Sequence, residues 1–283
     1  MNSAPKGKNV VGIIPLSGRK DAFGFPWPDY LQPLREGMLA VERSVYECAH
    51  AGCDSIWIVV NDDTAPLVKK RIGDYVMDPV YFKEKDFVKK KHLHEKWIPV
   101  YYTPILPKDR DRRDSLGWSV LHGALTSFIV ASKISRWVRP TKYFVSFPFG
   151  LYDAGFIASH RQSIRSKQSF FVSHEGKTVR DGKYLSFTFS PEDWLKYKRN
   201  IKNQCTGGDK NLPISERWSS RFFSLDKIFN CDNIVVDKKV EIEDYYHLDD
   251  WESLRKFYAS KVIINRPSRL FMKPYFINKP ENK

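Results

Sequence analysis

Short apolar runs alternate with a helical segment along residues 10–60. Residues 10–16 (VVGIIPL) are continuously apolar and largely β-branched, which is typical of a strand buried on both faces. Apolar positions then recur at three- and four-residue intervals from Met38 to Ala49, and Gly52 ends this predicted helix. Residues 55–60 (SIWIVV) form a second buried run. A strand, a helix and a strand within about 50 residues predict a right-handed crossover between parallel strands.

The same alternation continues along the chain and predicts a single α/β domain over residues 1–258. Further strands are expected at residues 98–103, 142–147, 168–173, 183–189 and 234–236, and further helices at 64–75, 115–134, 154–164, 191–200 and 248–258. The expected fold is a mostly parallel central sheet with flanking helices. Residues 259–283 contain three prolines among aromatic and basic residues, so we expect an extended basic C-terminal arm that packs on its own domain or mediates self-association.

Composition places the chain among packed globular proteins. Of the 283 residues, 42% are hydrophobic and 14% aromatic, which argues against a disordered chain. No apolar run is long enough to cross a bilayer, and residues 1–8 are polar, so we expect no membrane partner and a cytoplasmic location. The four cysteines are widely spread, and we expect them to be free thiols: Cys48, Cys53, Cys205 and Cys231.

The formal net charge of +14 indicates an anionic partner. Nucleotide phosphates, nucleic acid and other polyanions all satisfy this requirement, and charge alone does not choose among them. Basic runs at residues 89–91 and 110–113 are also what solvated loops contain. His92, His94 and Glu95 beside the first run could form a metal-ligand set, but a solvated loop is the favoured interpretation.

Candidate chemistry gathers in the Gly- and Pro-rich loop at residues 17–33, after the first strand. Small residues there let backbone N–H groups approach phosphates, and the following helix adds positive potential at its N-terminus. Arg19 can donate two hydrogen bonds to phosphate oxygens, and Lys20 adds a point charge. Ligands of parallel sheets bind at the carboxyl ends of the strands. The expected nucleotide contacts at these ends are Leu16, Ser17, Gly18, Arg19 and Asn61.

Six segments, in order along residues 10–258, carry a resemblance to a known family. They are residues 13–19 (IIPLSGR), 28–34 (PDYLQPL), 51–60 (AGCDSIWIVV), 115–121 (SLGWSVL), 143–153 (YFVSFPFGLYD) and 246–254 (YHLDDWESL). Together they resemble the sugar-phosphate nucleotidyltransferases, whose nucleotide-diphospho-sugar transferase fold is shared with GT-A glycosyltransferases. The resemblance implies a nucleotide or nucleotide-sugar ligand, with Gly117 near the base. It also implies Mg²⁺ held by Asp153 and Asp249, and catalysis by Arg19, Lys20 and Asp153.

The chain departs from the family pattern at two charged positions. Asp29 stands where the family has a phosphate-binding Lys, and Phe149 stands where it has a metal-binding Asp. Nucleotidyl transfer requires positive charge on the reacting phosphate, so both changes bear on activity. His247 precedes Asp249 and could orient it. The aromatic residues over the expected site either stack on a base or sugar or attach the loop to the core: Phe23, Phe25, Trp27 and Tyr30.

Three functions follow from these observations. The first is an active nucleotidyltransferase that uses Arg19, Lys20, Asp153 and Asp249. The second is a GT-A-type glycosyltransferase whose basic surface holds a nucleic-acid or other anionic acceptor, for which Asp62 and Asp63 form a weak carboxylate pair. The third is a binding or assembly protein that keeps the fold without the chemistry.

Overall fold

The central feature of this computed structural model is an eight-stranded sheet in the order β3-β4-β2-β1-β5-β8-β7-β9. The structure describes residues 9–80, 97–206, 220, 223–262 and 264. The strands are β1 (Val10–Pro15), β2 (Ser55–Val59), β3 (Tyr75–Met77), β4 (Trp97–Thr103), β5 (Lys142–Val145), β7 (Phe170–Ser173), β8 (Phe187–Phe189) and β9 (Lys238–Glu241). Two further short strands, β6 (Gly150–Leu151) and β10 (Tyr246–His247), pair with each other as an antiparallel ribbon.

The expected parallel core is confirmed. β1 lies between β2 and β5, and both of these neighbours run parallel to it, with Ile13 opposite Trp57 on one side and Val145 on the other. β4 continues the parallel set beyond β2. β8 runs antiparallel to β5 and β7, and β3 runs antiparallel to β4. The sheet is therefore mixed at its margins and parallel in the centre, where an α/β site forms.

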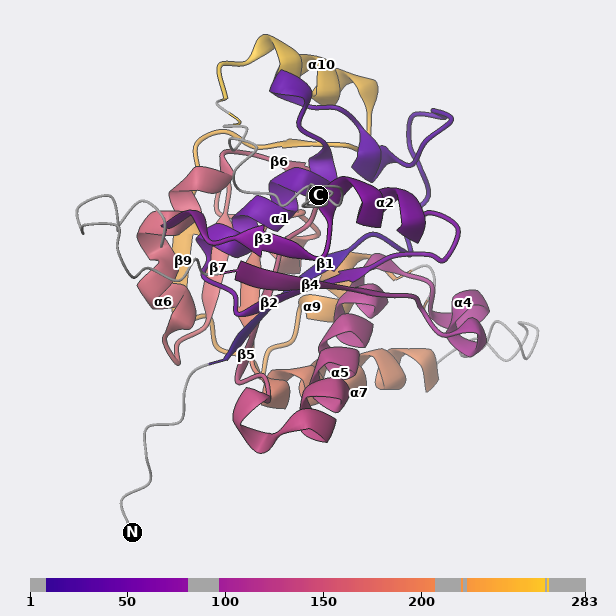
Figure 1. Ribbon diagram of the computed structural model, residues 1–283, viewed down its shortest axis with the longest axis vertical. Helices are drawn as coiled ribbons and strands as arrows, with labels where there is room; N and C mark the ends of the chain where they lie inside the picture. The colour runs from indigo at the N-terminus through magenta and orange to yellow at the C-terminus, as the bar shows by residue number, and fades with distance from the viewer. Residues whose placement is uncertain (1–8, 81–96, 207–219, 221–222, 263, 265–283) are drawn as a thin grey trace, which may run out of the picture.

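Helices cover both faces of the sheet (Figure 1). They are α1 (Ala40–His50), α2 (Ala65–Ile72), α4 (Pro107–Arg113), α5 (Leu116–Ile134), α6 (Arg161–Arg165), α7 (Pro191–Thr206), α9 (Leu225–Phe229) and α10 (Trp251–Ala259). A Cβ on Gly12 would meet the Sγ of Cys48 in α1, whereas a Cβ on Gly123 in α5 would meet Ile13. Since neighbouring strand residues point to opposite faces, α1 and α5 lie on opposite sides of β1.

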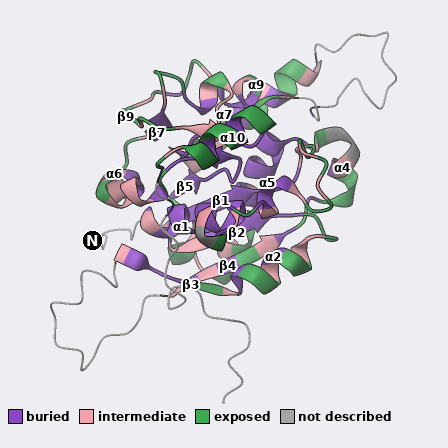
Figure 2. Cartoon of the chain, turned by 90° about the horizontal axis from the view of Figure 1, so that it is seen from above, coloured by how far each residue is buried: buried purple, intermediate pink, exposed green. Residues whose placement is uncertain are grey.

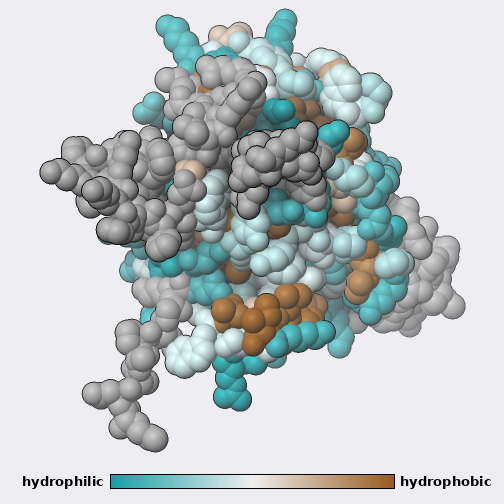
Figure 3. Space-filling view, viewed as in Figure 1, coloured by the Kyte–Doolittle hydropathy of each residue, from teal (hydrophilic) through white to brown (hydrophobic). Residues whose placement is uncertain are grey.

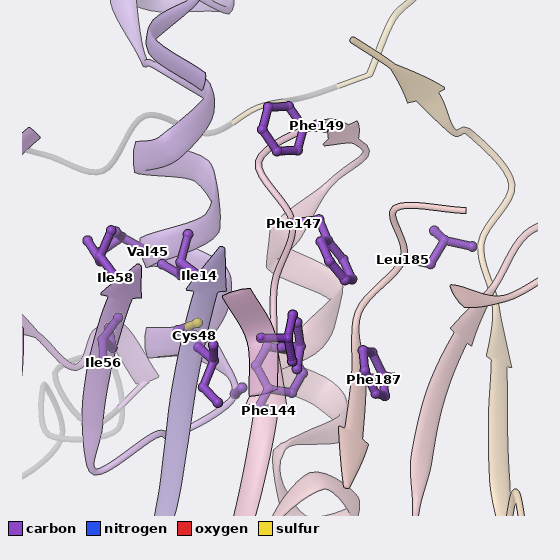
Figure 4. Close-up of a cluster of buried hydrophobic side chains, with 14 of the residues drawn as sticks. Ile14, Val45, Cys48, Ile56, Ile58, Phe144, Phe147, Phe149, Leu185 and Phe187 are labelled. Carbon is purple, nitrogen blue, oxygen red and sulfur yellow. The ribbon is translucent and has the colours of Figure 1, made fainter. Parts of the chain in front are cut away.

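The core is continuous across these layers. The central strands are buried, whereas α2 and α4 carry exposed surface (Figure 2). On the α1 side, Val45 and Cys48 lie near Ile14, and Phe147 and Phe149 follow β5 (Figure 4). Among the described residues no helix is long and apolar enough to span a membrane.

Local turns explain where the elements differ from the sequence expectations. Gly73 has a φ of 84° and ends α2 at Ile72, so Tyr75, expected in that helix, instead begins β3. The strand expected at 234–236 is wrong, because the Ile234 N–H closes a turn onto Cys231 and the strand starts at Lys238. The helix expected from residue 154 begins as a 3-10 turn over Ala154–His160.

A buried polar network joins α1 to the segments that follow β5. Arg43 and Glu47 are both fully buried, with 3.3 Å between Nη2 and Oε2. Arg43 also donates to the Phe147 carbonyl at 2.9 Å, while the hydroxyls of Tyr152 and Ser186 donate to Glu47 at 2.5 Å each. Burial, followed by the Glu47 charge, raises the pKa of Tyr152 well above its usual value. The carboxylate of Glu47 therefore accepts hydrogen bonds from three segments of the chain: Arg43 in α1, Tyr152 after β6 and Ser186 before β8.

Replacing Glu47 with Gln removes the charge that compensates Arg43. We expect the free energy of unfolding, measured by urea denaturation, to fall by about 3 kcal/mol or more, because a buried guanidinium is left unpaired. The matched control is Glu252→Gln, which breaks an exposed pair with Lys256 on α10 and should leave the urea midpoint unchanged. A loss below about 1 kcal/mol at Glu47 would show that the network contributes little.

Candidate functional site

The loop that follows β1 crosses the carboxyl ends of the parallel strands, where the nucleotide contacts were predicted. The backbone N–H groups of Leu16 and Ser17 both donate to the Val59 carbonyl, at 2.8 and 3.2 Å. The Ser17 hydroxyl donates to Oδ1 of Asn61 at 2.8 Å. These residues are therefore brought together, but the two N–H groups bind the neighbouring strand and are not directed toward a ligand.

Gly18 fixes this loop against the N-terminus of α5. Its φ is +89°, and a Cβ there would lie 2.3 Å from the carbonyl carbon of Ser115. Ser115 is the N-cap of α5 and accepts a hydrogen bond from the Trp118 N–H, and Ser119 donates to the Ser17 carbonyl at 2.7 Å. Only glycine permits both the left-handed backbone and the close approach.

Gly117, implied to approach a base, packs against protein. A Cβ on this residue would come within 2.5 Å of Cδ1 of Ile228 in α9. The absence of a side chain at Gly117 therefore lets α5 and α9 lie close together.

The guanidinium of Arg19 is the most heavily engaged group at the site. Nη1 donates to Oδ2 of Asp29 at 2.7 Å, and Nη2 donates to Oδ1 of Asp249 at 2.8 Å and to the Leu248 carbonyl. The Arg19 side chain is 10% exposed and that of Asp29 is fully buried. Asp29 also accepts from the Ala22 N–H at 2.7 Å. One positive charge thus faces two carboxylates in a largely buried environment.

Both departures from the family pattern converge on this guanidinium. Asp29 forms an ion pair with it, and the ring of Phe149 lies beneath it, 4.3 Å from the guanidinium carbon to the ring centroid. Burial lowers the pKa of Arg19, but Tyr184 and the two carboxylates outweigh burial, and the net pKa is raised. Arg19 stays charged and is held by its own protein. We refer to Arg19, Asp29, Phe149, Tyr184 and Asp249 as the Arg19 cluster.

Sequence reasoning missed one member of this cluster, Tyr184, and one backbone contact to it, at Leu248. The Tyr184 hydroxyl donates to Asp249 at 3.1 Å, and burial together with that carboxylate raises the pKa of Tyr184 to about 12. The Leu248 carbonyl accepts from Arg19. The one available signal was Asp29, because an acid that replaces a base near an arginine is a natural partner for it.

The carboxylates implied as metal ligands do not fit one shared cation. β6 and β10 are antiparallel, with Leu151 opposite Tyr246 and Gly150 opposite His247. The chain therefore continues toward Asp153 from one end of this two-stranded ribbon and toward Asp249 from the other end. Asp153 accepts from the Gly155 N–H at 2.7 Å and begins a 3-10 turn, and Asp249 is paired with Arg19. No group of three His, Cys, Asp or Glu suited to a metal occurs in the described part of the chain.

The aromatic residues of the loop attach it to α10. Phe23 packs against Trp251 with 5.0 Å between ring centroids, and Phe25 lies 5.4 Å from the same indole and stacks on Trp27. Tyr30 donates to the Thr64 hydroxyl at 2.8 Å. Of the two roles left open for these rings, the structure therefore supports attachment of the loop.

Three polar side chains at the strand ends remain accessible. Lys20 and Asn61 are exposed, and Arg110 in α4 is half-exposed and pairs with Asp62 at 2.5 Å. His247 lies beside the cluster, with Nδ1 3.4 Å from Oδ2 of Asp249 and 3.7 Å from Oδ2 of Asp250, but Nδ1 forms no hydrogen bond with either carboxylate, so the orienting role stays a prediction. His92, His94, Glu95 and residues 265–283 of the predicted arm lie outside the described residues.

The parallel centre, the strand-end loop and the covering helices define an open α/β fold whose ligand edge is the carboxyl ends of the strands. The sequence matches no protein-family model and no curated protein sequence. Solved structures do match. A protein described as a glucose-1-phosphate thymidylyltransferase, from Bacillus anthracis, superposes with a TM-score of 0.55 at 10% identity, covering 93% of this chain and 98% of that one.

Two other structures give the same result. A nucleoside-diphosphate-sugar pyrophosphorylase from Vibrio cholerae RC9 has a TM-score of 0.50 at 13% identity and covers 88% of this chain and 100% of its own. Rv0371c from Mycobacterium tuberculosis H37Rv has a TM-score of 0.50 at 10% identity, with coverages of 89% and 99%. The resemblance to sugar nucleotidyltransferases is thereby confirmed for the fold.

A double-mutant cycle tests the Arg19–Asp29 pair. Arg19→Met leaves the buried Asp29 carboxylate unpaired, so we expect it to lower the free energy of unfolding by about 3–5 kcal/mol. Asp29→Asn removes one of the two carboxylates that pair with the buried Arg19 guanidinium, so we expect it to lower the free energy of unfolding less. The coupling energy from urea denaturation should be about 2 kcal/mol or more. The exposed pair Arg110→Met with Asp62→Asn is the control and should couple by less than about 1 kcal/mol. Equal coupling in the two cycles would contradict this account.

Proposed function

We propose that this protein binds a nucleotide or nucleotide-sugar at the carboxyl ends of β1 and β2 without transferring a nucleotidyl group. The observation that carries the proposal is the engagement of Arg19 by Asp29, Asp249 and the Phe149 ring. The fold supports a nucleotide ligand, because open parallel sheets bind ligands at this edge. The proposal joins the nucleotide-binding expectation to the interpretation of a protein that keeps the fold and lacks the chemistry.

The electrostatics of the Arg19 cluster explain why transfer is not expected. Stabilising a reacting phosphate requires a preorganised, uncommitted positive group aimed at its oxygens. Arg19 already faces two carboxylates, so a phosphate would have to displace Asp29 or Asp249 from it. Displacing Asp29 would leave this fully buried carboxylate without its partner, which is strongly unfavourable. Asp249 is 43% exposed and is held in place by the Tyr184 hydroxyl as well as by Arg19.

Metal-assisted transfer lacks support from the same residues. The phenyl ring of Phe149 cannot replace a carboxylate ligand. Asp153 and Asp249 follow β6 and β10 at opposite ends of the β6–β10 ribbon. The proposed function therefore does not require Mg²⁺ bound by Asp153 and Asp249. A divalent cation would enter with the nucleotide, coordinated by its phosphates.

The accessible polar groups are suited to holding phosphates from outside the cluster. Lys20 is exposed beside Arg19, Asn61 follows β2, and Arg110 lies on α4 with its partner Asp62 at the surface. Lys and Arg bind phosphate as a point charge and as a fork, respectively. A cytoplasmic location, nucleic-acid contact through the basic surface and self-association through the arm stay predictions.

Thermal denaturation and pyrophosphate exchange together test this function. We expect nucleoside triphosphates or nucleotide-sugars to raise the melting temperature, with or without Mg²⁺, because binding to the folded state stabilises it. Lys20→Ala should weaken binding about tenfold through loss of a charged phosphate contact. Pyrophosphate exchange with triphosphate and sugar phosphates should stay at background.

Lys256→Ala is the control for the lysine variant, because Lys256 is exposed on α10, where it pairs with Glu252. Its nucleotide affinity should equal that of the unaltered protein. Pyrophosphate exchange above background that disappears in Arg19→Lys would show an active transferase and contradict the proposal. Absence of stabilisation by every nucleotide tested would remove the binding function as well.

A further inference from the structure

A second pocket lies at the opposite end of the sheet from the candidate nucleotide site. It has a volume of about 440 Å³ and is bounded by the amino ends of β1, β2 and β4 and by the C-terminal half of α5. One wall is the Trp57–Tyr101 ring pair, whose centroids are 4.7 Å apart. The other wall contains Ile134, Trp137 and Val138. We call this hollow the amino-end pocket.

The wall formed by α5 and the turn after it exposes large apolar side chains. Ile134 is 72% exposed and Trp137 is 73% exposed, and Val130 and Val138 are also exposed beside them. In Figure 3 a brown apolar cluster is visible at the lower front of the molecule, where the end of α5 lies in Figure 1. A contiguous apolar patch around a hollow indicates an interaction site, because water contact with such groups is unfavourable.

Basic residues flank the apolar wall of the amino-end pocket along the chain. Lys133 and Arg136 are exposed on either side of Ile134, and Arg139 is partly exposed after Val138. The acid in the lining, Asp54, is paired with Arg165 at 3.1 Å and accepts from the Val10 N–H. The charges around the apolar wall are therefore predominantly positive.

We propose that the amino-end pocket docks a segment of a partner protein in which apolar anchor side chains alternate with acidic residues. The apolar anchors fill the space between the indoles of Trp57 and Trp137, and the acids pair with Lys133 and Arg136. Buried aromatic contacts supply most of the energy of such interfaces, and complementary charge supplies rate and selectivity. The site lies apart from the Arg19 cluster, so this inference does not depend on the proposed function.

Charge argues against a second copy of the chain and against either terminal segment as the occupant. A second copy joined through the same patch would bring two sets of these basic residues together. Residues 265–283 carry five basic residues and one acidic residue, and residues 1–8 carry two lysines and no acid. The hollow between aromatic walls suits inserted side chains better than the flat surface of a bilayer.

Selection from a display library of random peptides of about twelve residues tests the docking site, since segments of this length can fill a groove. On the full chain we expect enrichment of sequences that combine aromatic or leucine anchors with Asp and Glu. Synthetic peptides from the enriched set should bind at least tenfold more weakly to Trp137→Ala and to Ile134→Asp. Replacing both Lys133 and Arg136 with Glu should weaken binding and reduce its dependence on salt.

The control is Leu195→Ala, which removes another exposed apolar side chain, 48% exposed, from α7. It should leave peptide affinity unchanged. Four results would overturn the proposal: no enrichment, enrichment of basic sequences, equal enrichment on Trp137→Ala, or self-association that Trp137→Ala abolishes. Binding of anionic vesicles or single-stranded DNA that requires Trp137, without acidic-peptide binding, would also overturn it and assign the pocket to that partner.

Discussion

The guanidinium of Arg19 joins segments that are distant in sequence and adjacent in the fold. It binds Asp29 in its own loop, rests on Phe149 beyond β5, and holds Leu248 and Asp249 ahead of α10. A buried guanidinium must keep such partners, since leaving it unpaired is costly. Arg19 therefore helps to fix the conformation of the loop after β1 and the position of α10, together with the packing of Phe23 and Phe25 on Trp251. The same side chain would be the phosphate ligand in the family that the chain resembles.

The two ends of the sheet have different chemistry. At the carboxyl ends, Arg19 is already paired, and Lys20, Asn61 and Arg110 are among the described side chains accessible to a phosphate. At the amino ends, Ile134 and Trp137 are left exposed beside a hollow. Under the proposed function, the sheet remains the frame on which both sites are built although transfer chemistry is absent. Binding at either end is compatible with the α1–β5 core network remaining intact.

The centre of the fold followed from sequence, and the margins did not. Residues 10–16 and 55–60 are long enough apolar runs to reveal buried parallel strands, and the helix between them has clear periodicity. β3, β6 and β10 are two or three residues long and carry no period. The site residues were placed near the strand ends, but the pairing of Arg19 with Asp249 spans 230 positions and no local pattern contains it. Asp29 was noticed as a reversed charge, although its partner was not.

The central claim is that Arg19 is bound by the protein and stays bound when nucleotide is present. Nitrogen-15 NMR of the arginine side chains measures this directly, because a guanidinium held at both ends rotates slowly and gives separate Nη signals. The Arg19 signals are identified by their loss in Arg19→Lys. The account predicts that these signals are resolved and do not shift at saturating nucleotide, whereas the backbone signals near Lys20 and Asn61 do shift. A shift or exchange of the Arg19 signals on nucleotide binding would contradict it and return this residue to phosphate recognition.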